Sequence, residues 1–345
     1  LKEMPKYAKY SRKVKESIKK EQENRRKKTY KLRKEMIKRN ELHDKLKHKY
    51  GFDGFIHTTN FSNFINIMDK GYIYSRCKAK GENLLNIDSA DEGVISGTSK
   101  YVQRSVRFYY RVKTPTHYRN EGIAPGNPEY HMPIPVMLVA CKDIYKYYDI
   151  LYTDGNARSG ITKKSNKAKC VYNYNFDRIF SQGDYNYCSY EEKREITRQR
   201  NAELLVPDRV SLKVINKIIF RSDADFKMAN ILFGDDPRFI VNKNRFFNKN
   251  QYCEDYFIIV DNNKIKYRFK LNKYDEHSIR QFNHTLRCEF KSSIIEYDLS
   301  KHTTYIVPKY GKYNIVGVLN IGNASSDLKS IEYLIDGHVS AIWRR

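Results

Sequence analysis

The sequence predicts an α+β protein with a basic helical extension at its N-terminus and an antiparallel β unit at its C-terminus. Three observations support this prediction. Residues 1–50 contain no glycine and are dominated by Lys, Arg, Glu and Gln, which are good helix formers. Residues 51–240 alternate between short apolar or β-branched runs and helical patterns. Residues 241–345 contain short strand patterns separated by turn residues.

The N-terminal extension carries about half of the net positive charge. Within residues 1–50, 20 Lys or Arg stand against 7 Asp or Glu, so +13 of the formal net charge of +25 lies there. Leu42, Leu46 and Tyr50 recur at a spacing of four and give a narrow stripe for packing. We interpret the extension either as an arm that lies along a phosphate backbone or as a solvated helix that shields a core edge.

The charge indicates a polyanionic partner, and nucleic acid is the leading candidate, because a basic surface raises the local concentration of phosphate-bearing ligands. The alternative is that the positive charge reflects AT-rich coding, which shifts the composition toward Lys, Asn, Tyr and Ile without selection for binding. The six cysteines have neither the spacing of a zinc ribbon nor that of a disulfide framework, and no metal is expected. No apolar run approaches the ~18 residues of a membrane span. We expect a cytoplasmic protein without membrane attachment.

The central region begins with a strand over residues 55–59. A helix over residues 61–71 follows, with Ser62 as its N-cap and Gly71 as its C-terminal stop. Further strands are predicted over 105–111, 136–140, 202–207 and 210–220, and helical segments over 191–200 and 223–233. In the C-terminal region we predict a hairpin of 256–260 with 265–271 and strands over 293–299, 303–307, 313–319 and 331–335.

Residues 153–190 have too little aliphatic content for a core and are predicted to form a long loop. Their aromatic residues alternate with cations, a composition that suits stacking on bases beside a charged backbone. Packing of the tyrosines over the loop's own turns is the alternative. The residues concerned are Tyr172, Tyr174, Phe176, Tyr185, Tyr187 and Tyr190, with Lys164, Lys167, Lys169 and Arg178.

Three side chains stand out as chemical candidates: His57 on the first strand, a cation after residues 108–110, and Glu203 in an apolar strand. A His ring can hydrogen-bond ribose hydroxyls and a cation can hold a pyrophosphate. A carboxylate can stabilise an oxocarbenium ion or take a proton. Burial of a lone Glu is costly unless the residue is paired or used, although an edge-strand Glu facing water is the alternative. These features alone indicate a basic, nucleotide-handling α+β enzyme.

Five segments of the chain, listed at the end of this paragraph, follow one another in the same order as in the DarT family. The chain therefore resembles this family of NAD-dependent ADP-ribosyltransferase toxins, which modify bases of DNA. The resemblance covers approximately residues 52–260. Its Thr-Pro-Thr and Arg-Ser-Asp-Ala elements are more similar to the guanine-modifying branch than to the thymine-modifying one. The segments are His57-Thr58-Thr59 with Asn63 and Gly71, Arg107 to Thr116 with Tyr118, Thr153 to Ala157, Arg200 to Val206, and Phe220 to Ala224.

The resemblance implies an ADP-ribosyltransferase-like fold with two small sheets around an NAD cleft. It implies Glu203 and Lys113 as catalytic residues, with NAD as the substrate and no metal. It also implies single-stranded or flipped DNA as the acceptor and a macrodomain antitoxin as a partner. RNA as the acceptor, or a non-catalytic basic module that binds nucleic acid, are the alternatives. The residues implied to hold NAD are His57, Thr58, Thr59, Asn63, Arg111 and Asn156.

One position departs from the family pattern. The family usually has Pro-Arg where this chain has Val112-Lys113. Lys keeps the charge but lacks the planar fork that grips a phosphate with two hydrogen bonds. This departure leaves three interpretations open: reduced activity, an engineered loss of activity, or a shift of the role to Arg111.

Overall fold

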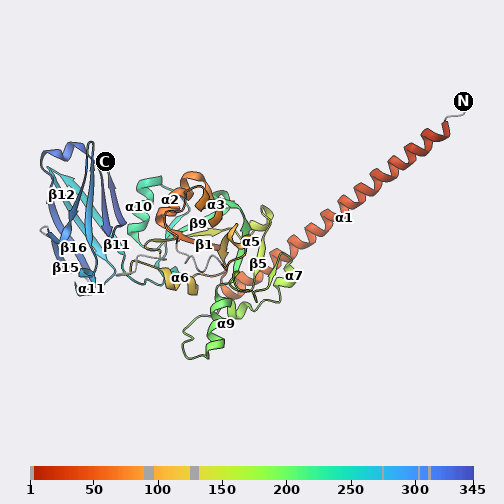
Figure 1. Cartoon of the computed structure of the whole chain (residues 1–345), viewed down its shortest axis with the longest axis horizontal. Helices are drawn as coiled ribbons and strands as arrows, with labels where there is room; N and C mark the ends of the chain where they lie inside the picture. Colours follow the sequence, from red (N-terminus) through yellow and green to blue (C-terminus); the bar gives the residue numbers. More distant parts are fainter. Residues whose placement is uncertain (1–3, 89–96, 125–131, 274–275, 302–303, 310–311) are drawn as a thin grey trace. The chain divides into compact units, whose positions relative to one another are not determined.

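The computed structural model describes residues 4–88, 97–124, 132–273, 276–301, 304–309 and 312–345. The chain divides into two compact units (Figure 1). The first consists of residues 1–52 with 165–174, and the second of residues 53–164 with 175–345. The predicted regions 1–50, 51–240 and 241–345 remain a prediction about domain organisation.

In the first unit, residues Met4–Tyr50 form one helix, α1, in agreement with the glycine-free composition. The side chains of residues 19–34 are exposed, whereas Leu42 and Leu46 are buried. Within this unit α1 packs on the short helix α7 (Ala168–Val171), whose first backbone N–H donates to Glu35 Oε1 over 2.6 Å. Of the α1 side chains that the structure describes, the buried ones therefore lie near the C-terminal end of the helix.

The centre of the second unit is an eight-stranded sheet with the order β10-β9-β4-β1-β3-β7-β5-β6. All of its pairings with given registers are antiparallel except that of β9 with β10. The strands are β1 (Phe55–Asn60), β3 (Ser105–Tyr109), β4 (Pro135–Ala140), β5 (Leu151–Thr153), β6 (Lys164–Ser165), β7 (Glu203–Pro207), β9 (Ile215–Phe220) and β10 (Phe239–Val241).

This sheet consists of two halves joined at β1 and β3. Strand β1 pairs with β4 along all of its six residues, but with β3 only at Ile56 and Tyr109. The two separate small sheets implied by the resemblance are therefore replaced by one sheet that is nearly divided. A further two-stranded sheet pairs β2 (Tyr72–Tyr74) with β8 (Arg209–Ser211). The α+β class with mixed helices and sheets is confirmed.

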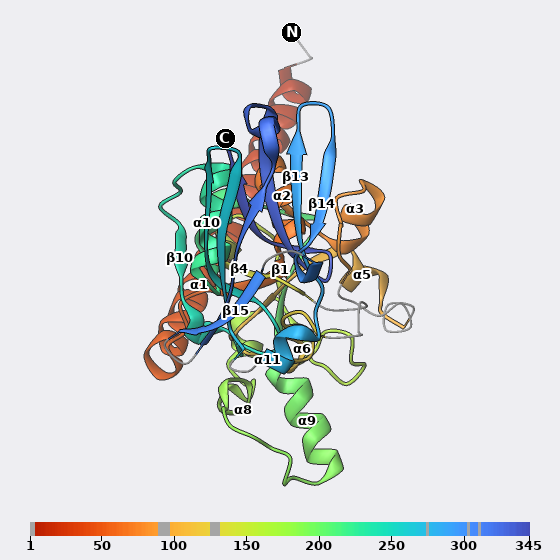
Figure 2. The same ribbon diagram turned by 90° about the vertical axis from the view of Figure 1, so that its left-hand side faces the viewer.

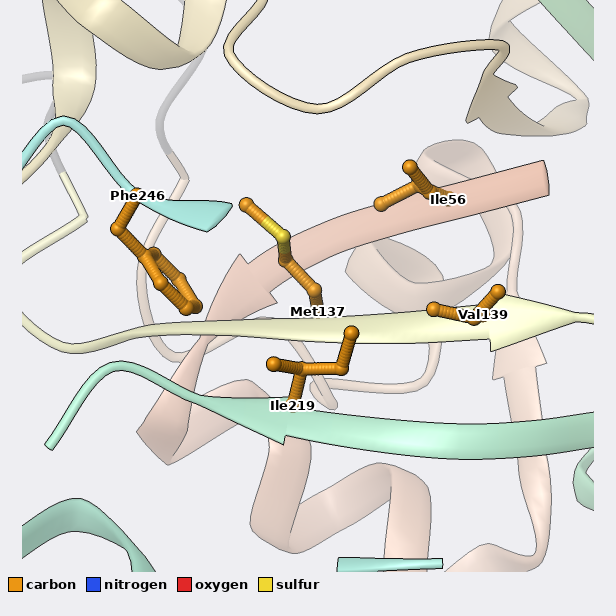
Figure 3. Close-up of a cluster of buried hydrophobic side chains, with 5 residues drawn as sticks. All are labelled: Ile56, Met137, Val139, Ile219 and Phe246. Carbon is orange, nitrogen blue, oxygen red and sulfur yellow. The ribbon is translucent and has the colours of Figure 1, made fainter. Parts of the chain in front are cut away.

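Both faces of the β10-β9-β4-β1 half are covered. Figure 3 shows a cluster that joins Ile56 of β1, Met137 and Val139 of β4, and Ile219 of β9 to Phe246. The opposite face carries edge-to-face aromatic contacts with helices α2 (Phe61–Lys70) and α10 (Asp223–Phe233). The rings of that aromatic cluster are Phe61, Phe64, Phe220, Phe226, Phe233 and Phe239.

The start of α2 corrects one prediction. Asn60, not Ser62, occupies the N-cap position, and Ser62 lies within the first turn. The Asn60 side chain donates to Ser62 Oγ and accepts the backbone N–H of Ile134. Gly71 ends the helix with a left-handed φ of 71°, as predicted.

The segment 153–190 is not one long loop. It contains short helices whose aliphatic residues are buried, including Val171 and Ile179. Tyr174 and Phe176 are buried as well, whereas Tyr187 and Tyr190 are exposed. The remaining helices are α3 (Arg76–Gly81), α5 (Lys100–Gln103), α6 (Pro115–Asn120), α8 (Phe176–Phe180), α9 (Tyr190–Arg200) and α11 (Glu276–Arg280), with 3₁₀ turns η1 (Ile144–Lys146), η2 (Leu212–Val214), η3 (Lys243–Arg245), η4 (Leu299–Lys301) and η5 (Gly322–Asp327).

The C-terminal strands form two four-stranded antiparallel sheets, β11-β12-β16-β15 and β14-β13-β17-β18 (Figures 1 and 2). Buried residues of both sheets meet where the Phe269 and Tyr333 rings stack at 3.6 Å. The strands are β11 (Cys253–Asp261), β12 (Lys264–Leu271), β13 (His284–Phe290), β14 (Ile294–Asp298), β15 (Thr304–Lys309), β16 (Lys312–Asn320), β17 (Leu328–Ile335) and β18 (His338–Arg344). None of the helices described is both long and apolar enough to cross a bilayer.

Candidate active site

Glu203 is the first residue of β7 and its side chain is fully buried. Strands β3 and β7 pair Tyr109 with Glu203, so Arg107 is the diagonal neighbour of the carboxylate on the same face. Arg107 Nε lies 2.8 Å and its Nη2 2.5 Å from Glu203 Oε1. The backbone N–H of Ala157 donates to Glu203 Oε2 over 2.9 Å. Both carboxylate oxygens are therefore held in place.

Arg107 remains a cation beside this carboxylate. Burial by itself lowers the pKa of Arg107, but the charges of Glu203 and Tyr109 and the hydrogen bond to Glu203 raise that pKa above its usual value. About a third of the Arg107 side chain, 36%, remains exposed. A carboxylate whose oxygens are fixed by an arginine and a backbone N–H can accept a proton from a reacting group.

Tyr109 lies directly opposite Glu203 in the strand register. Burial raises its pKa to about 12; the neighbouring Glu203 carboxylate adds to this, while Arg107 opposes it. The phenol therefore stays protonated at neutral pH and remains a hydrogen-bond donor.

His57 lies across the junction of the two sheet halves from Arg107. Its Nδ1 is 3.0 Å from the backbone oxygen of Arg107. Burial lowers the pKa of His57, so the ring is neutral at pH 7. A neutral ring with Nδ1–H donating to a carbonyl leaves Nε2 as an acceptor. This is the tautomer that can accept a hydroxyl of a ribose.

A cavity of about 200 Å³ opens where β1 and β3 diverge. His57, Thr58, Thr59 and Arg107 line it together. Its volume is smaller than the ~300–1,000 Å³ of a site that encloses a whole drug-sized ligand, so it suits one end of a dinucleotide. The other lining residues are Asn60, Asn63, Asn66, Ile67, Ile73, Tyr74, Arg76, Ala79, Leu84, Leu85, Ile87, Asp88, Tyr109 and Met132.

Asn63 also lines this cavity, but its amide is engaged with the cavity wall. Its Nδ2 donates to the Ile87 backbone oxygen over 2.8 Å, and its Oδ1 accepts the backbone N–H groups of Asn86 and Ile87. In this structure Asn63 fixes the segment after α3. Asn156 lies beside the pair instead, with its Oδ1 3.5 Å from Arg107 Nη2.

Lys113 is the cation that the resemblance implies as a catalytic residue. It has a left-handed φ of 55°, and its Nζ is 5.9 Å from the centre of the Phe247 ring. The preceding Val112 packs against the core cluster of Figure 3. Lys113 lines a groove that is separate from the cavity at His57.

Arg111 lines the same groove, but its guanidinium is occupied. Its Nη1 donates to the backbone oxygens of Ile179 and Ser181 at 3.2 and 2.5 Å. Burial, together with the charge of Arg200, lowers its pKa to about 10, so Arg111 remains a cation at neutral pH. The structure thus brings His57, Thr58, Thr59, Asn63, Asn156 and Glu203 around Arg107, and places Lys113 and Arg111 in the groove.

The groove has a volume of about 830 Å³ and combines five cations with three aromatic rings. Lys249 Nζ lies 4.3 Å from the Tyr118 ring centre, and the Arg200 guanidinium 4.7 Å from that of Tyr185. Tyr118 is 52% exposed. The cations are Arg111, Lys113, Arg119, Arg200 and Lys249, and the rings are Tyr118, Tyr185 and Phe247. Such a combination suits a single-stranded polyanion with unstacked bases.

Residues 56–247 match the family model described as "ssDNA thymidine ADP-ribosyltransferase, DarT". The chain belongs to the DarT family. This confirms the predicted class, an NAD-dependent ADP-ribosyltransferase of DNA. The family description names thymidine, so it does not support the predicted preference for guanine.

No curated protein matches the chain. Among solved structures, Thermus sp. 2.9 DarT with ADP-ribosylated ssDNA is similar at 14% identity, over 56% of this chain and 95% of that one, with a TM-score of 0.48. The same Thermus protein with NAD⁺ has a TM-score of 0.45 at 14% identity, over 56% and 96%. Thermosipho africanus DarTG with ADP-ribose has a TM-score of 0.45 at 19% identity, over 61% and 54%.

The sequence interpretation of this DarT domain missed Arg107 and Tyr109. Both lie in a quoted segment, two residues apart on one strand, and therefore on one face. Arg107 and Tyr109 alternate on one strand, and Glu203 begins another. This pattern points to the two residues only when the pairing of β3 with β7 is known. No group of three or more His, Cys, Asp or Glu suited to a metal occurs among the residues that the structure describes.

Proposed function

We propose that this DarT-family chain transfers ADP-ribose from NAD to a base of single-stranded DNA and releases nicotinamide. The observation that carries the proposal is a buried Glu203 held by Arg107, with a cavity at His57 and a basic aromatic groove at Lys113. The cavity would take the nicotinamide-ribose end of NAD. The groove would take the DNA.

The two openings are joined through short stretches of chain. Strand β3 carries Arg107 and Tyr109 in the cavity, and Arg111 follows two residues later in the groove. Arg200 lines the groove three residues before Glu203. Between them, Asn201 Oδ1 accepts the backbone N–H of Thr116 over 3.3 Å. A base entering from the groove would therefore approach the carboxylate.

The reaction begins with cleavage of the bond between the ribose carbon and the nicotinamide nitrogen, and nicotinamide leaves with the electron pair. The cation that remains on the ribose is stabilised by the fixed Glu203 carboxylate. A ring or exocyclic nitrogen of the base attacks this carbon, and its proton passes to Glu203. The neutral His57 would orient a ribose hydroxyl through Nε2.

Arg107 would supply the cation near the reacting centre that we assigned to Lys113 from the sequence. Its guanidinium reaches both Glu203 and the cavity. Lys113 would instead hold the acceptor strand. Lys at this position keeps the charge needed for contact with a phosphate, without the two-point grip of an Arg.

The test combines full-length protein with NAD labelled on its adenylate moiety and a panel of oligonucleotides. The panel holds single-stranded DNA with thymine only, single-stranded DNA with guanine as the added base, and RNA of the same sequences. Label on DNA with release of nicotinamide supports the proposal, and the labelled oligonucleotide identifies the base. Label confined to RNA or to protein contradicts it. A calorimetric titration with NAD that shows no binding would favour a non-catalytic module.

The resemblance also implies a macrodomain antitoxin that removes the modification. If the transfer product is an ADP-ribosylated base, a macrodomain hydrolase should restore the original oligonucleotide. Restoration is measured as loss of label from the purified product. Persistence of the label would argue against such a partner.

A further inference from the structure

Strand β12 carries four cations at alternate positions, Lys264, Lys266, Arg268 and Lys270, which we call the basic column. The residues between them, Ile265, Tyr267, Phe269 and Leu271, are buried in the sandwich. Successive residues of a strand point to opposite faces, so the column lies on the outer face of the sheet. At ~3.4 Å per residue its four members extend over ~20 Å.

Apolar side chains flank the basic column on both neighbouring strands. In the strand registers Phe257 of β11 and Val316 of β16 pair with Arg268, and Ile259 and Val318 pair with Lys266. Phe257, Ile259 and Val318 are 47%, 40% and 49% exposed. Exposed apolar side chains that gather on one face of a sheet indicate a surface that another molecule covers.

The opposite sheet of the sandwich provides an internal comparison. Its outer face places Arg287 between Glu296 and Glu332, at 2.7 and 3.1 Å. There the cation is neutralised by carboxylates on both adjacent strands. Around Arg268 the corresponding cross-strand positions are occupied by Phe257 and Val316. The two outer faces therefore differ in charge: Arg287 is neutralised by carboxylates, whereas Arg268 lies between apolar residues.

Carboxylates on the basic face lie at its ends. Lys266 pairs with Asp261 at 3.1 Å, and Lys270 lies 3.5 Å from Glu254. The Lys266–Asp261 pair is about half exposed, and ion pairs of this kind stabilise a fold by less than ~1 kcal/mol. A phosphate can therefore replace Asp261 as the partner of Lys266 at small cost.

We propose that the outer face of β11, β12 and β16 binds single-stranded DNA, with phosphates along the basic column and a base stacked on Phe257. Sites for single-stranded nucleic acid combine cations that contact the phosphates with an exposed aromatic ring on which a base stacks. The face lies outside the matched family region, residues 56–247, and belongs to the same compact unit. Tyr256 OH donates to the Ile342 backbone oxygen and so joins the two sheets of the sandwich. Lys227 of α10 pairs with Asp255 of β11, which ties the sandwich to the central region of the chain.

This inference rests on the proposed function only in its choice of DNA as the polyanion. Binding to the face requires neither NAD nor Glu203. It would hold the strand beyond the acceptor base and so lower the KM for long substrates. Oligonucleotides too short to reach the face would gain nothing from it.

The test measures fluorescence anisotropy of a labelled 30-nucleotide oligothymidylate with the full chain and no NAD. The triple variant Lys264→Gln, Lys266→Gln and Arg268→Gln is compared with Lys291→Gln, Lys301→Gln and Lys329→Gln on the other sheet and its connections. The control removes equal charge from residues that are at least half exposed. We expect about tenfold weaker binding for the first triple, with a salt dependence lower by roughly 2 in slope, and little change for the second.

Phe257→Ala provides a second variant that leaves the charge intact. We expect about tenfold weaker binding, because base stacking on an aromatic ring is lost. Circular dichroism melting identifies variants that fail to fold. Equal losses in both triples, wild-type binding by the first triple, or equally tight binding of duplex DNA would overturn the proposal. Transfer to a 6-nucleotide acceptor should be unchanged in all folded variants; its absence in the wild type would refute the proposed function and leave the anisotropy result valid.

Discussion

The cavity at His57 and the groove at Lys113 hold their polar groups in different ways. In the cavity, Glu203 is bound by Arg107 and by a backbone N–H, and His57 by a backbone carbonyl. In the groove, Lys113 and Lys249 lie over aromatic rings, whereas Arg111 is held by backbone oxygens. Groups that are fixed before the reaction suit bond breaking, because they need no rearrangement during it. Lysines that lie over aromatic rings suit a single strand with unstacked bases.

The largest expected effect is that of Glu203→Gln. The amide keeps the size and hydrogen-bonding oxygen of the carboxylate but loses its charge and basicity. The rate of transfer to DNA should fall by ~10²–10⁴-fold, as for loss of a general base. Glu195→Gln in α9 removes a carboxylate that is 41% exposed and should leave the rate near that of the wild type. Single-turnover rates measure both, and wild-type activity in Glu203→Gln would place the chemistry elsewhere.

The second expected effect is a difference in kcat between the variants Arg107→Lys and Arg111→Lys. Arg107→Lys keeps the charge but not the two-atom contact with Glu203, which should cost ~1.5–3 kcal/mol in transition-state energy, or ~10–100-fold in kcat. Arg111→Lys is the matched control, because the Arg111 guanidinium contacts backbone carbonyls instead. Steady-state kinetics with NAD decide between the two. Equal losses of kcat would remove the distinction between cavity and groove.

The third prediction concerns His117, which is buried beside Phe246 and Phe247. Burial, with the charges of Arg221 and Lys113, lowers its pKa to about 3. The folded protein therefore takes up fewer protons than the unfolded chain. The contribution of His117 to the free energy of unfolding is complete above pH ~6.5 and falls as the pH drops toward 3. The fall is at most ~2 kcal/mol at pH 5, because the Glu121 carboxylate 3.2 Å from His117 Nε2 favours the protonated ring.

Urea unfolding of the wild type and His117→Gln at pH 7 and pH 5 checks this prediction. The variant should lose up to ~2 kcal/mol less between the two pH values, whatever its stability at pH 7. The comparison between variants is needed because burial raises the pKa of nearby Asp225 to about 6, which acts in the opposite direction. Parallel pH dependences would show that His117 is not the group that titrates.

The smallest expected effect is that of Lys113→Ala. Loss of one phosphate contact should weaken DNA binding by ~0.5–1 kcal/mol and lower the salt-dependence slope by ~0.7. The KM for NAD should not change. Lys213→Ala, which removes another exposed lysine, is the control. If Lys113→Ala abolished turnover of NAD, Lys113 would belong to the reacting centre, as the resemblance alone implied.

Strand prediction shows where sequence patterns were sufficient. In the hairpin of β11 and β12, polar and buried residues alternate along β12, and a short Asn-rich turn joins the two strands. The ends of both strands were predicted to within a few residues. Strands β13 and β18 were missed. Their sequences, HTLRCEF and HVSAIWR, mix polar and small residues with few aliphatic ones. They become strands because β17 pairs with both of them.

The sequence by itself determined the α+β class, the family and the basic character of the chain, because these depend on local patterns and on the order of motifs. It also predicted His57 and Glu203 as site residues. Tertiary structure decided the partners. The pairing of β3 with β7 makes Arg107 the cation at Glu203, although 96 residues separate them. The packing of Val112 in the core directs the following Lys113 to the groove. Side chains distant in sequence meet only through strand register and packing, which no local pattern encodes.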